Sequence, residues 1–169
     1  MFTNETITKN VRELLKKYDT RDPFRIAARL GIEVLYTDTL SRLKGMYRVI
    51  KRNRFIILNN KNSPKMNRIV CAHELGHDRL HREYATDRTL KEFMLYDMST
   101  RQEYEANVFA AALLLDDETV LEYIEQGLDT EQIALATETD INLVALKVDC
   151  LIRDGHHLRM QGHNSKFLK

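Results

Sequence analysis

Apolar residues recur at helical spacing along most of the chain and at strand spacing in one short region. In residues 7–15 they lie i, i+4, i+7 and i+8 apart, which predicts a helix with one buried side. Residues 32–36, 45–50 and 55–58 are rich in β-branched and aromatic side chains, and the polar residues 51–54 predict a hairpin turn between the last two. The pattern therefore predicts an α+β fold, with a small antiparallel or mixed sheet packed on helices.

Two long helices are predicted in the middle of the chain. The first covers about residues 64–82 and begins after Ser63, a capping residue that is followed by proline at the first helical position. The second covers about residues 100–115 and is apolar on most sides after Asn107, so we expect it to be buried. Shorter helices are indicated by their expected capping residues, which are Asp22-Pro23, Asp116-Asp117, Thr130 and Asp140.

The first long helix contains His73-Glu74-Leu75-Gly76-His77, which has the form H-E-x-x-H. Residues four apart on a helix lie roughly 40° apart on one face, so both imidazoles can bind one metal ion. Glu74 lies next to the open coordination position, where a carboxylate can take a proton from a bound water. The alternative is an amphipathic core helix with two incidental histidines.

A hydrolytic zinc site typically has three protein ligands and a water, so a third ligand is needed. Glu103 is the favoured candidate, because it begins the buried helix and Asn107 follows one turn later on the same face. From there, Asn107 could hydrogen-bond a ligating imidazole from outside the metal site. The longer histidine spacing of metzincins is excluded, because this chain has Glu83 at the position where that class has histidine. The candidates considered after His77 are His81, Glu83, Glu92, Asp97, Glu103 and Glu105.

Two other residues, and another role for Glu103 itself, bear on this choice. His81 lies a further four residues along the helix and could approach the metal. Glu105 faces about 200° away from Glu103 on the helix, so we expect it to be solvated. Glu103 could instead form a capping box with Thr100, although such a cap does not exclude a ligand role.

Composition and charge restrict the class of protein. The chain has 169 residues, 43% hydrophobic and 30% charged, with a net charge of +1, which is ordinary for a globular protein. No apolar run approaches the roughly 20 residues that span a bilayer, and no secretory signal is visible. Cys71 and Cys150 suggest no disulfide framework. We therefore expect a cytoplasmic protein without a membrane partner, and its oligomeric state stays open.

Charge is distributed unevenly along the chain. Residues 42–68 contain nine Lys and Arg residues and no acid, whereas residues 103–146 contain many acids and no Lys or Arg. This pattern could steer a partner of matching polarity, or it could reflect ordinary solvated helix surfaces.

The chain resembles the ImmA/IrrE metallopeptidase family in residues 69–81 (IVCAHELGHDRLH) and 103–115 (EYEANVFAAALLL). The resemblance implies a zincin-like core, with His73, His77 and Glu103 as ligands of Zn²⁺ and Glu74 as the base. It also implies cleavage of a protein substrate, commonly a helix-turn-helix repressor of a phage or integrative element. Mn²⁺ is a possible substitute for zinc.

The expected organisation is a metallopeptidase domain over residues 1–127, a helical segment over 128–155 and a flexible basic tail over 156–169. Residues 130–153 have the rhythm of a helix-turn-helix. The second of these helices lies in the acidic part of the chain, so nucleic-acid binding is disfavoured. Residues 83–98 have no regular pattern apart from a possible short helical turn.

Three functions are compatible with the sequence. The first is a zinc endopeptidase, for which an extended substrate could pair with residues 55–58 as an edge strand. The second is a non-proteolytic regulator that binds its partner stoichiometrically, and the third is a DNA-binding regulator with a vestigial zincin core. An intact Glu74 favours the endopeptidase, because a structural site needs no base. By chemistry alone, the residues that could stabilise an oxyanion are Tyr47, Tyr84, Tyr96 and Tyr104.

Overall fold

The computed structural model describes residues 1–85 and 100–158. Within these ranges it has seven α-helices, a short 3₁₀ helix and three strands, as the sequence predicts for an α+β protein. In chain order the elements are α1 (Asn4–Tyr18), α2 (Pro23–Arg29), β1 (Ile32–Thr37), β2 (Gly45–Ile50), β3 (Asn53–Asn59), α3 (Pro64–Leu80), η1 (Arg82–Ala85), α4 (Arg101–Leu114), α5 (Asp117–Glu125), α6 (Thr130–Ala136) and α7 (Ile141–Arg153).

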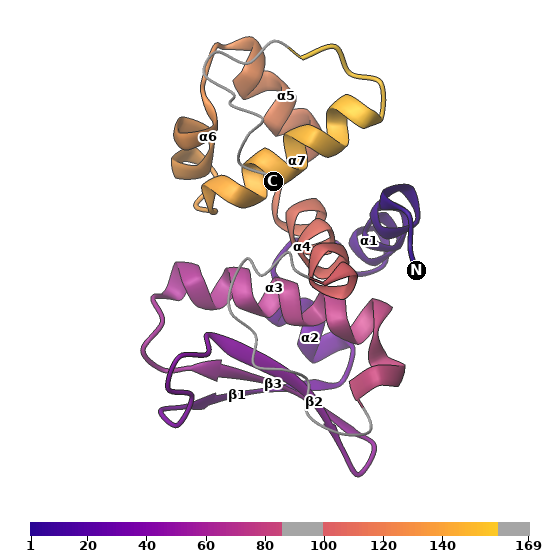
Figure 1. The fold of residues 1–169 in the computed structure, drawn as a ribbon, viewed down its shortest axis with the longest axis vertical. Coiled ribbons are helices and arrows are strands. Elements are labelled where there is room, and N and C mark those ends of the chain that lie inside the picture. The colour runs from indigo at the N-terminus through magenta and orange to yellow at the C-terminus, as the bar shows by residue number, and fades with distance from the viewer. Residues whose placement is uncertain (86–99, 159–169) are drawn as a thin grey trace.

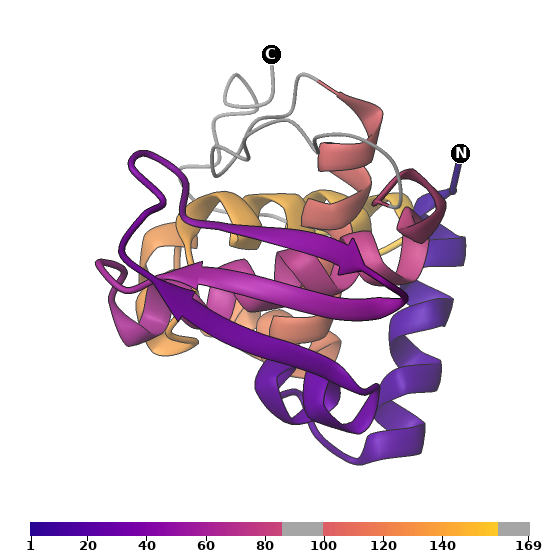
Figure 2. The same cartoon turned by 90° about the horizontal axis from the view of Figure 1, so that it is seen from below.

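The three strands form a mixed sheet in the order β1-β3-β2 (Figure 2). β2 and β3 form the expected antiparallel hairpin, with Lys51 and Arg52 at positive φ in its turn. β1 pairs with β3 in parallel, with Val34 opposite Ile56. The prediction that residues 55–58 form an edge is therefore wrong, because β3 is the central strand and β2 lies at an edge.

α3 lies across one face of the sheet, and α4 lies beyond α3 (Figure 1). Tyr47, Ile56 and Leu58 project from the sheet into the core below α3 and are almost fully buried. A Cβ at Gly45 would lie 2.4 Å from Val70 Cγ1, so glycine is needed where β2 passes under the helix. Gly45 thus lets β2 pack closely against α3 at Val70, one turn before the H-E-x-x-H motif.

Local capping explains where the helices begin. The Ser63 side chain accepts a hydrogen bond from Met66 N and is followed by Pro64, as expected. Thr100 caps α4 in the same way, through Glu103 N. The cap of α6 is Asp129 rather than the predicted Thr130, because Asp129 and Gln132 form a reciprocal capping box.

The last three helices gather at the end of the molecule away from the sheet (Figure 1). α5 lies with α6 and α7 there, and the apolar side of α7 is buried. The proposed boundary between residues 127 and 128 stays a prediction. Most of the predicted irregular segment 83–98 and most of the basic tail 156–169 lie outside the described residues. Within the described ranges, no helix is both long enough and apolar enough to cross a membrane.

Candidate metal centre

The candidate centre lies where α3 and α4 cross at close distance. A Cβ at Gly76 would lie 3.0 Å from the Cα of Ala106 and 3.2 Å from the Cβ of Phe109. Gly76 sits between the two histidines of the motif, and Ala106 follows Glu103 by one turn. Small residues at the crossing therefore bring the carboxylate of one helix to the imidazoles of the other.

His73, His77 and Glu103 meet at this crossing, with one ligand atom of each residue within 4.8 Å of the others. The two Nε2 atoms are 3.0 Å apart. His73 Nε2 lies 3.2 Å from Glu103 Oε2, and His77 Nε2 lies 3.5 Å from Glu103 Oε1. Atoms bound at about 2.0–2.1 Å to one tetrahedral ion lie about 3.3 Å apart, so these separations fit a shared metal ion.

Asn107 fixes the orientation of the first histidine. His73 Nδ1 lies 2.9 Å from Asn107 Oδ1, which can only accept, so Nδ1 carries the proton and Nε2 presents its lone pair to the centre. Burial lowers the pKa of His73 to about 4, which keeps the ring neutral. A neutral imidazole is the form that binds a metal.

The Glu103 carboxylate is suited to facing a cation. Burial opposes its charged form, but the adjacent imidazoles of His73 and His77 lower its pKa to about 2. Burial also opposes the charged form of His77, yet the Glu103 hydrogen bond and the Glu74 charge raise the pKa of His77. Lone pairs from two imidazoles and one carboxylate thus converge, and a cation between them removes their mutual repulsion.

Glu74 is 1% exposed, and its carboxylate lies close enough to His77 and Glu103 to interact electrostatically with both. Its Oε1 has no hydrogen-bond partner among the described residues, whereas the Tyr47 backbone N–H donates to the carboxylate. Burial raises the pKa of Glu74 to about 7. A carboxylate with a pKa near neutrality and one free oxygen can both accept and return a proton.

His81 and Glu105 lie behind His77 rather than at the centre. His81 Nδ1 is 3.2 Å from His77 Nδ1, on the side of that ring opposite Nε2, so His81 is not among the clustered ligand atoms. Glu105 is 2% exposed and its Oε2 lies 3.1 Å from His81 Nε2. The prediction that Glu105 is solvated is therefore wrong, because the N-terminal segment covers that side of α4.

The tyrosines proposed by chemistry have other partners where the structure describes their side chains. The Tyr47 hydroxyl donates to Asp78 Oδ1 at 2.7 Å, and the hydroxyl of Tyr104 accepts from Asn4. The side chain of Tyr84 and all of Tyr96 lie outside the described residues. Neither described hydroxyl is directed at the metal cluster.

The sequence reading missed Asp78, which directly follows the motif and is buried. Its carboxylate accepts from Tyr47, from Arg54 on β3 and from Arg82 after α3. Asp78 thereby ties the metal-bearing helix to the sheet. The available signal was an acid on a buried helix face with arginines nearby in sequence, but the partner on β3 required the fold.

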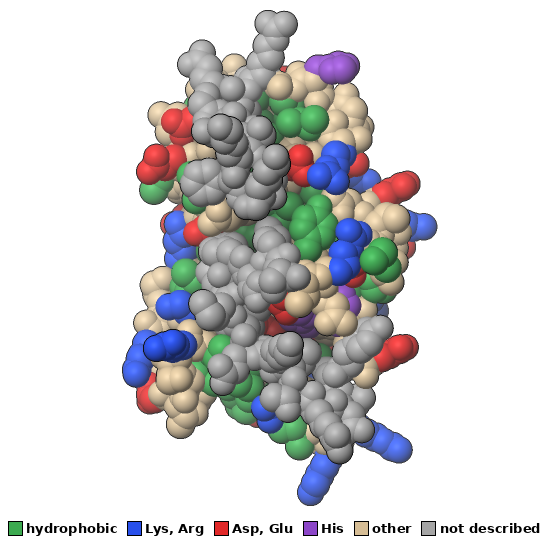
Figure 3. Space-filling view, in the orientation of Figure 1, with side chains coloured by type: hydrophobic (Ala, Val, Ile, Leu, Met, Phe, Trp, Pro, Cys, Tyr) green, Lys and Arg blue, Asp and Glu red, His purple; other side chains and the backbone are tan. Residues whose placement is uncertain are grey.

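The centre comes nearest to the surface at Glu103. The Glu103 side chain is 18% exposed. In the space-filling view, acidic and histidine side chains reach the visible face at the level where α3 and α4 cross (Figure 3). Of the three clustered side chains, that of Glu103 is the most exposed, whereas those of His73 and His77 are buried.

A family model and two known proteins match most of this chain. The family described as the IrrE N-terminal-like domain of peptidase family M78 matches residues 27–150, which include all three clustered residues. Uncharacterized immunity region protein 2 of Bacillus phage phi105 is 34% identical over 137 residues, covering 81% of this chain and 85% of the phage protein. Metallopeptidase ImmA of Bacillus subtilis (strain 168) is 28% identical over 137 residues, covering 79% of each chain.

Proposed function

Since this chain belongs to the M78 family of IrrE N-terminal-like metallopeptidases, we propose that it is a zinc-dependent endopeptidase that cleaves a helix-turn-helix transcriptional repressor of a phage or integrative element. The observation that carries the proposal is the convergence of His73, His77 and Glu103 with the buried carboxylate of Glu74 beside them. Two imidazoles and one carboxylate are a ligand set used by hydrolytic zinc.

The residues of this chain divide the chemical work between them. When bound, zinc supplies a Lewis acid that polarises the scissile carbonyl and lowers the pKa of a water molecule. Asn107 keeps the Nε2 lone pair of His73 directed at the ion, and Glu103 supplies negative charge. Glu74 takes a proton from the attacking water on its free oxygen and returns it to the leaving amine.

The environment of Glu74 favours catalysis over a purely structural or regulatory site. A structural zinc site is closed by four protein ligands and needs no base. Here the cluster offers three ligands within the described residues, and a carboxylate with a raised pKa lies next to them. This arrangement supports the endopeptidase over a regulator that only binds its partner.

The open edge of β2 is the proposed pairing strand for an extended substrate. β2 pairs with β3 on one side and has no strand partner on the other among the described residues. Tyr47, in the middle of β2, contacts Glu74 through its backbone, so this strand borders the centre. A peptide added along β2 would gain main-chain hydrogen bonds next to the metal ligands.

The nature of the substrate is proposed from relatives and from charge. One relative is described as a phage immunity region protein and the other as a metallopeptidase. Direct DNA binding by α7 is disfavoured because Lys147 is buried against Asp117 and Arg153 pairs with Asp149. The basic residues of α7 are therefore engaged within the protein, which supports a protein substrate over nucleic acid.

The test is to incubate the purified protein with the repressor encoded beside its gene, and to follow cleavage by mass spectrometry. We expect discrete fragments with the zinc-loaded protein, no fragments after chelation, and recovery when zinc is added back. An intact repressor in the presence of stoichiometric zinc, together with a stable complex of the two proteins, would favour the regulator instead.

A further inference from the structure

The two histidines of the centre are supported in different ways. The Nδ1 of His73 lies 2.9 Å from the side-chain oxygen of Asn107. The corresponding nitrogen of His77 faces a second imidazole, His81, at 3.2 Å. A histidine is an unusual hydrogen-bond partner for a ligating imidazole, because its own ring must be held in place before it can orient another ring.

Metal binding by His77 Nε2 would fix the order of the protons in this second arrangement. If His77 Nε2 presents a lone pair to a metal, its Nδ1 carries a proton and donates to His81 Nδ1. His81 then carries its proton on Nε2, which lies 3.1 Å from Glu105 Oε2 and donates to it. His81 therefore acts as a neutral relay that accepts from His77 and donates to Glu105.

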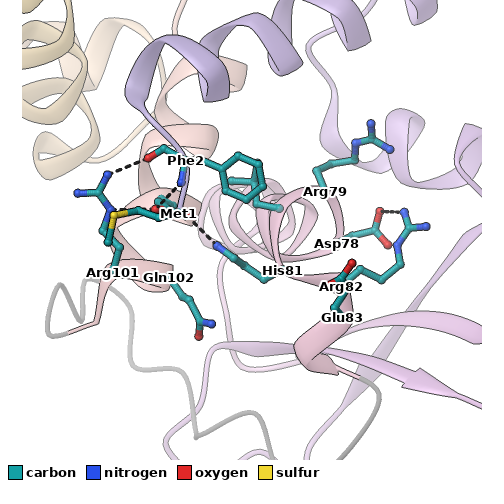
Figure 4. A pocket seen from close by; sticks show the side chains of 11 residues that line it. Met1, Phe2, Asp78, Arg79, His81, Arg82, Glu83, Arg101 and Gln102 are labelled. Carbon is teal, nitrogen blue, oxygen red and sulfur yellow. Dashed lines mark hydrogen bonds and ion pairs between the residues drawn. The ribbon is translucent and has the colours of Figure 1, made fainter.

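The far end of the relay is fixed by the N-terminal segment. Glu105 Oε1 accepts from Arg101 Nε at 2.8 Å and from the backbone N–H of Phe2 at 3.1 Å. Arg101 also donates to the backbone carbonyl of Phe2 at 2.8 Å. Figure 4 shows Phe2, His81 and Arg101 meeting at one side of a cavity of about 690 Å³. Both Glu105 oxygens therefore have polar partners, although these partners, Phe2, His81 and Arg101, are far apart in sequence.

We propose that His81, Glu105 and the backbone of Phe2 form a positioning relay that holds the His77 ring, and its tautomer, for metal binding. This relay rests on the metal site proposed above. It makes the N-terminal residues part of the support of the centre, even though they lie some 75 residues from His77. His81 and Glu105 are positioning residues, since neither is among the clustered ligand atoms.

The main experiment measures zinc affinity by competition with a chromophoric chelator. His81→Leu fills a similar space but can neither accept from His77 nor donate to Glu105, so we expect about 10- to 100-fold weaker zinc binding. His81→Gln can accept and donate at once, so it should recover most of the affinity. Gln102→Ala, which alters the same cavity outside the relay, is the matched control and should bind zinc as the unaltered chain does.

A pair of variants at Phe2 tests the backbone link without altering the core. Phe2→Pro removes the N–H that donates to Glu105, whereas Phe2→Ala keeps that N–H and removes the ring that packs edge-on against His81. We expect Phe2→Pro to weaken zinc binding more than Phe2→Ala does. This pair carries the test by itself should His81→Leu fail to fold.

The absorption spectrum of the cobalt-substituted protein separates positioning from packing. The visible bands should shift in His81→Leu and return in His81→Gln, because they report the geometry of the ligands. Equal zinc affinity and equal spectra in His81→Leu and Gln102→Ala would overturn the relay. A loss of zinc affinity in His81→Gln as large as that in His81→Leu would also overturn the relay. An unaltered chain that binds no zinc would instead overturn the proposed metal site itself.

Discussion

Both halves of α4 contain buried side chains, but these are buried for different reasons. At its start, Glu103, Glu105 and Asn107 face α3 and each makes a directed polar contact with a histidine. At its end, Leu113 and Leu114 lie in an apolar core with α1 and α7 near by. One helix therefore carries a polar site and an apolar core within four turns.

The comparison separates two kinds of constraint. At the polar end, function depends on the orientation and tautomer of each histidine ring. In the wrong orientation or tautomer, an imidazole presents an N–H instead of a lone pair to the metal. At the apolar end, what matters is the volume filled, and side chains of similar size can replace one another at small cost. Substitutions at the two ends should therefore fail in different assays.

The largest effect is expected at the polar side of the crossing, from Glu74→Gln. The amide cannot accept the proton of the attacking water, so the cleavage rate should fall about 10²- to 10⁴-fold. Zinc content and the thermal midpoint should stay close to those of the unaltered chain, because Glu74 is not among the clustered ligand atoms. Cleavage at an undiminished rate by this variant would show that another group is the base.

Leu113→Ala tests the apolar end. Leu113 is fully buried, so the truncation should lower the free energy of unfolding by about 2–5 kcal/mol. Leu113→Met, which conserves volume, should cost less than about 1.5 kcal/mol. Chemical denaturation measures both values, and zinc affinity below the unfolding transition should not change. A large loss of zinc affinity in Leu113→Ala would mean that the two ends are coupled.

Gly76→Ala lies between the two ends, at the closest approach of the helices. Alanine usually stabilises a helix interior relative to glycine, but its Cβ here would lie 3.0 Å from the Cα of Ala106. We therefore expect a loss of about 1–3 kcal/mol in the free energy of unfolding, together with weaker zinc binding. A more stable protein with unchanged zinc affinity would show that the crossing has room to spare.

The smallest effect is expected at the ion pair between Lys147 and Asp117. Burial opposes the charged form of Asp117, but Lys147 and, to a lesser extent, Arg12 outweigh it and lower the pKa of Asp117 below its usual value. The pair therefore stabilises the fold above the unfolded pKa of about 3.9, and this contribution is lost as the pH falls through the lower folded pKa. Asp117→Asn should cost on the order of 1 kcal/mol at pH 7 and progressively less in acid.

The control for this pair is the double variant with Lys147→Met. If the pair with Lys147 accounts for most of the pH dependence, Asp117→Asn should have a smaller and less pH-dependent effect once Lys147 is gone, with the remainder due to Arg12. A pH-independent difference between Asp117→Asn and the unaltered chain would contradict the assignment.

Much of the fold was predictable because its signals are local. Ser63 followed by Pro64 marks the start of α3, and Thr100 marks the start of α4. The spacing of His73 and His77 is a property of any helix, and the position of Glu103 one turn before Asn107 follows from the same geometry. These features depend on neighbours within a few residues.

The parts that the sequence did not predict depend on distant partners. The sequence pattern predicts that Glu105 is a surface residue. In the structure it accepts a hydrogen bond from the backbone N–H of Phe2, which lies 103 residues away in the sequence. β3 reads as an edge because its hairpin with β2 is local, whereas its parallel pairing with β1 is not. Asp78 likewise finds Arg54 across the sheet. Periodicity predicts which side of a helix or strand is polar, but it cannot predict which distant segment of the chain will bury a residue on that side.

The central claim is that His73, His77 and Glu103 bind one zinc ion. The most direct measurement is anomalous diffraction at the zinc absorption edge from crystals grown with zinc. The account predicts a single strong peak about 2.0–2.2 Å from Nε2 of both histidines and from a Glu103 oxygen. A peak held by His81, or no peak at the crossing of α3 and α4 at saturating zinc, would contradict it.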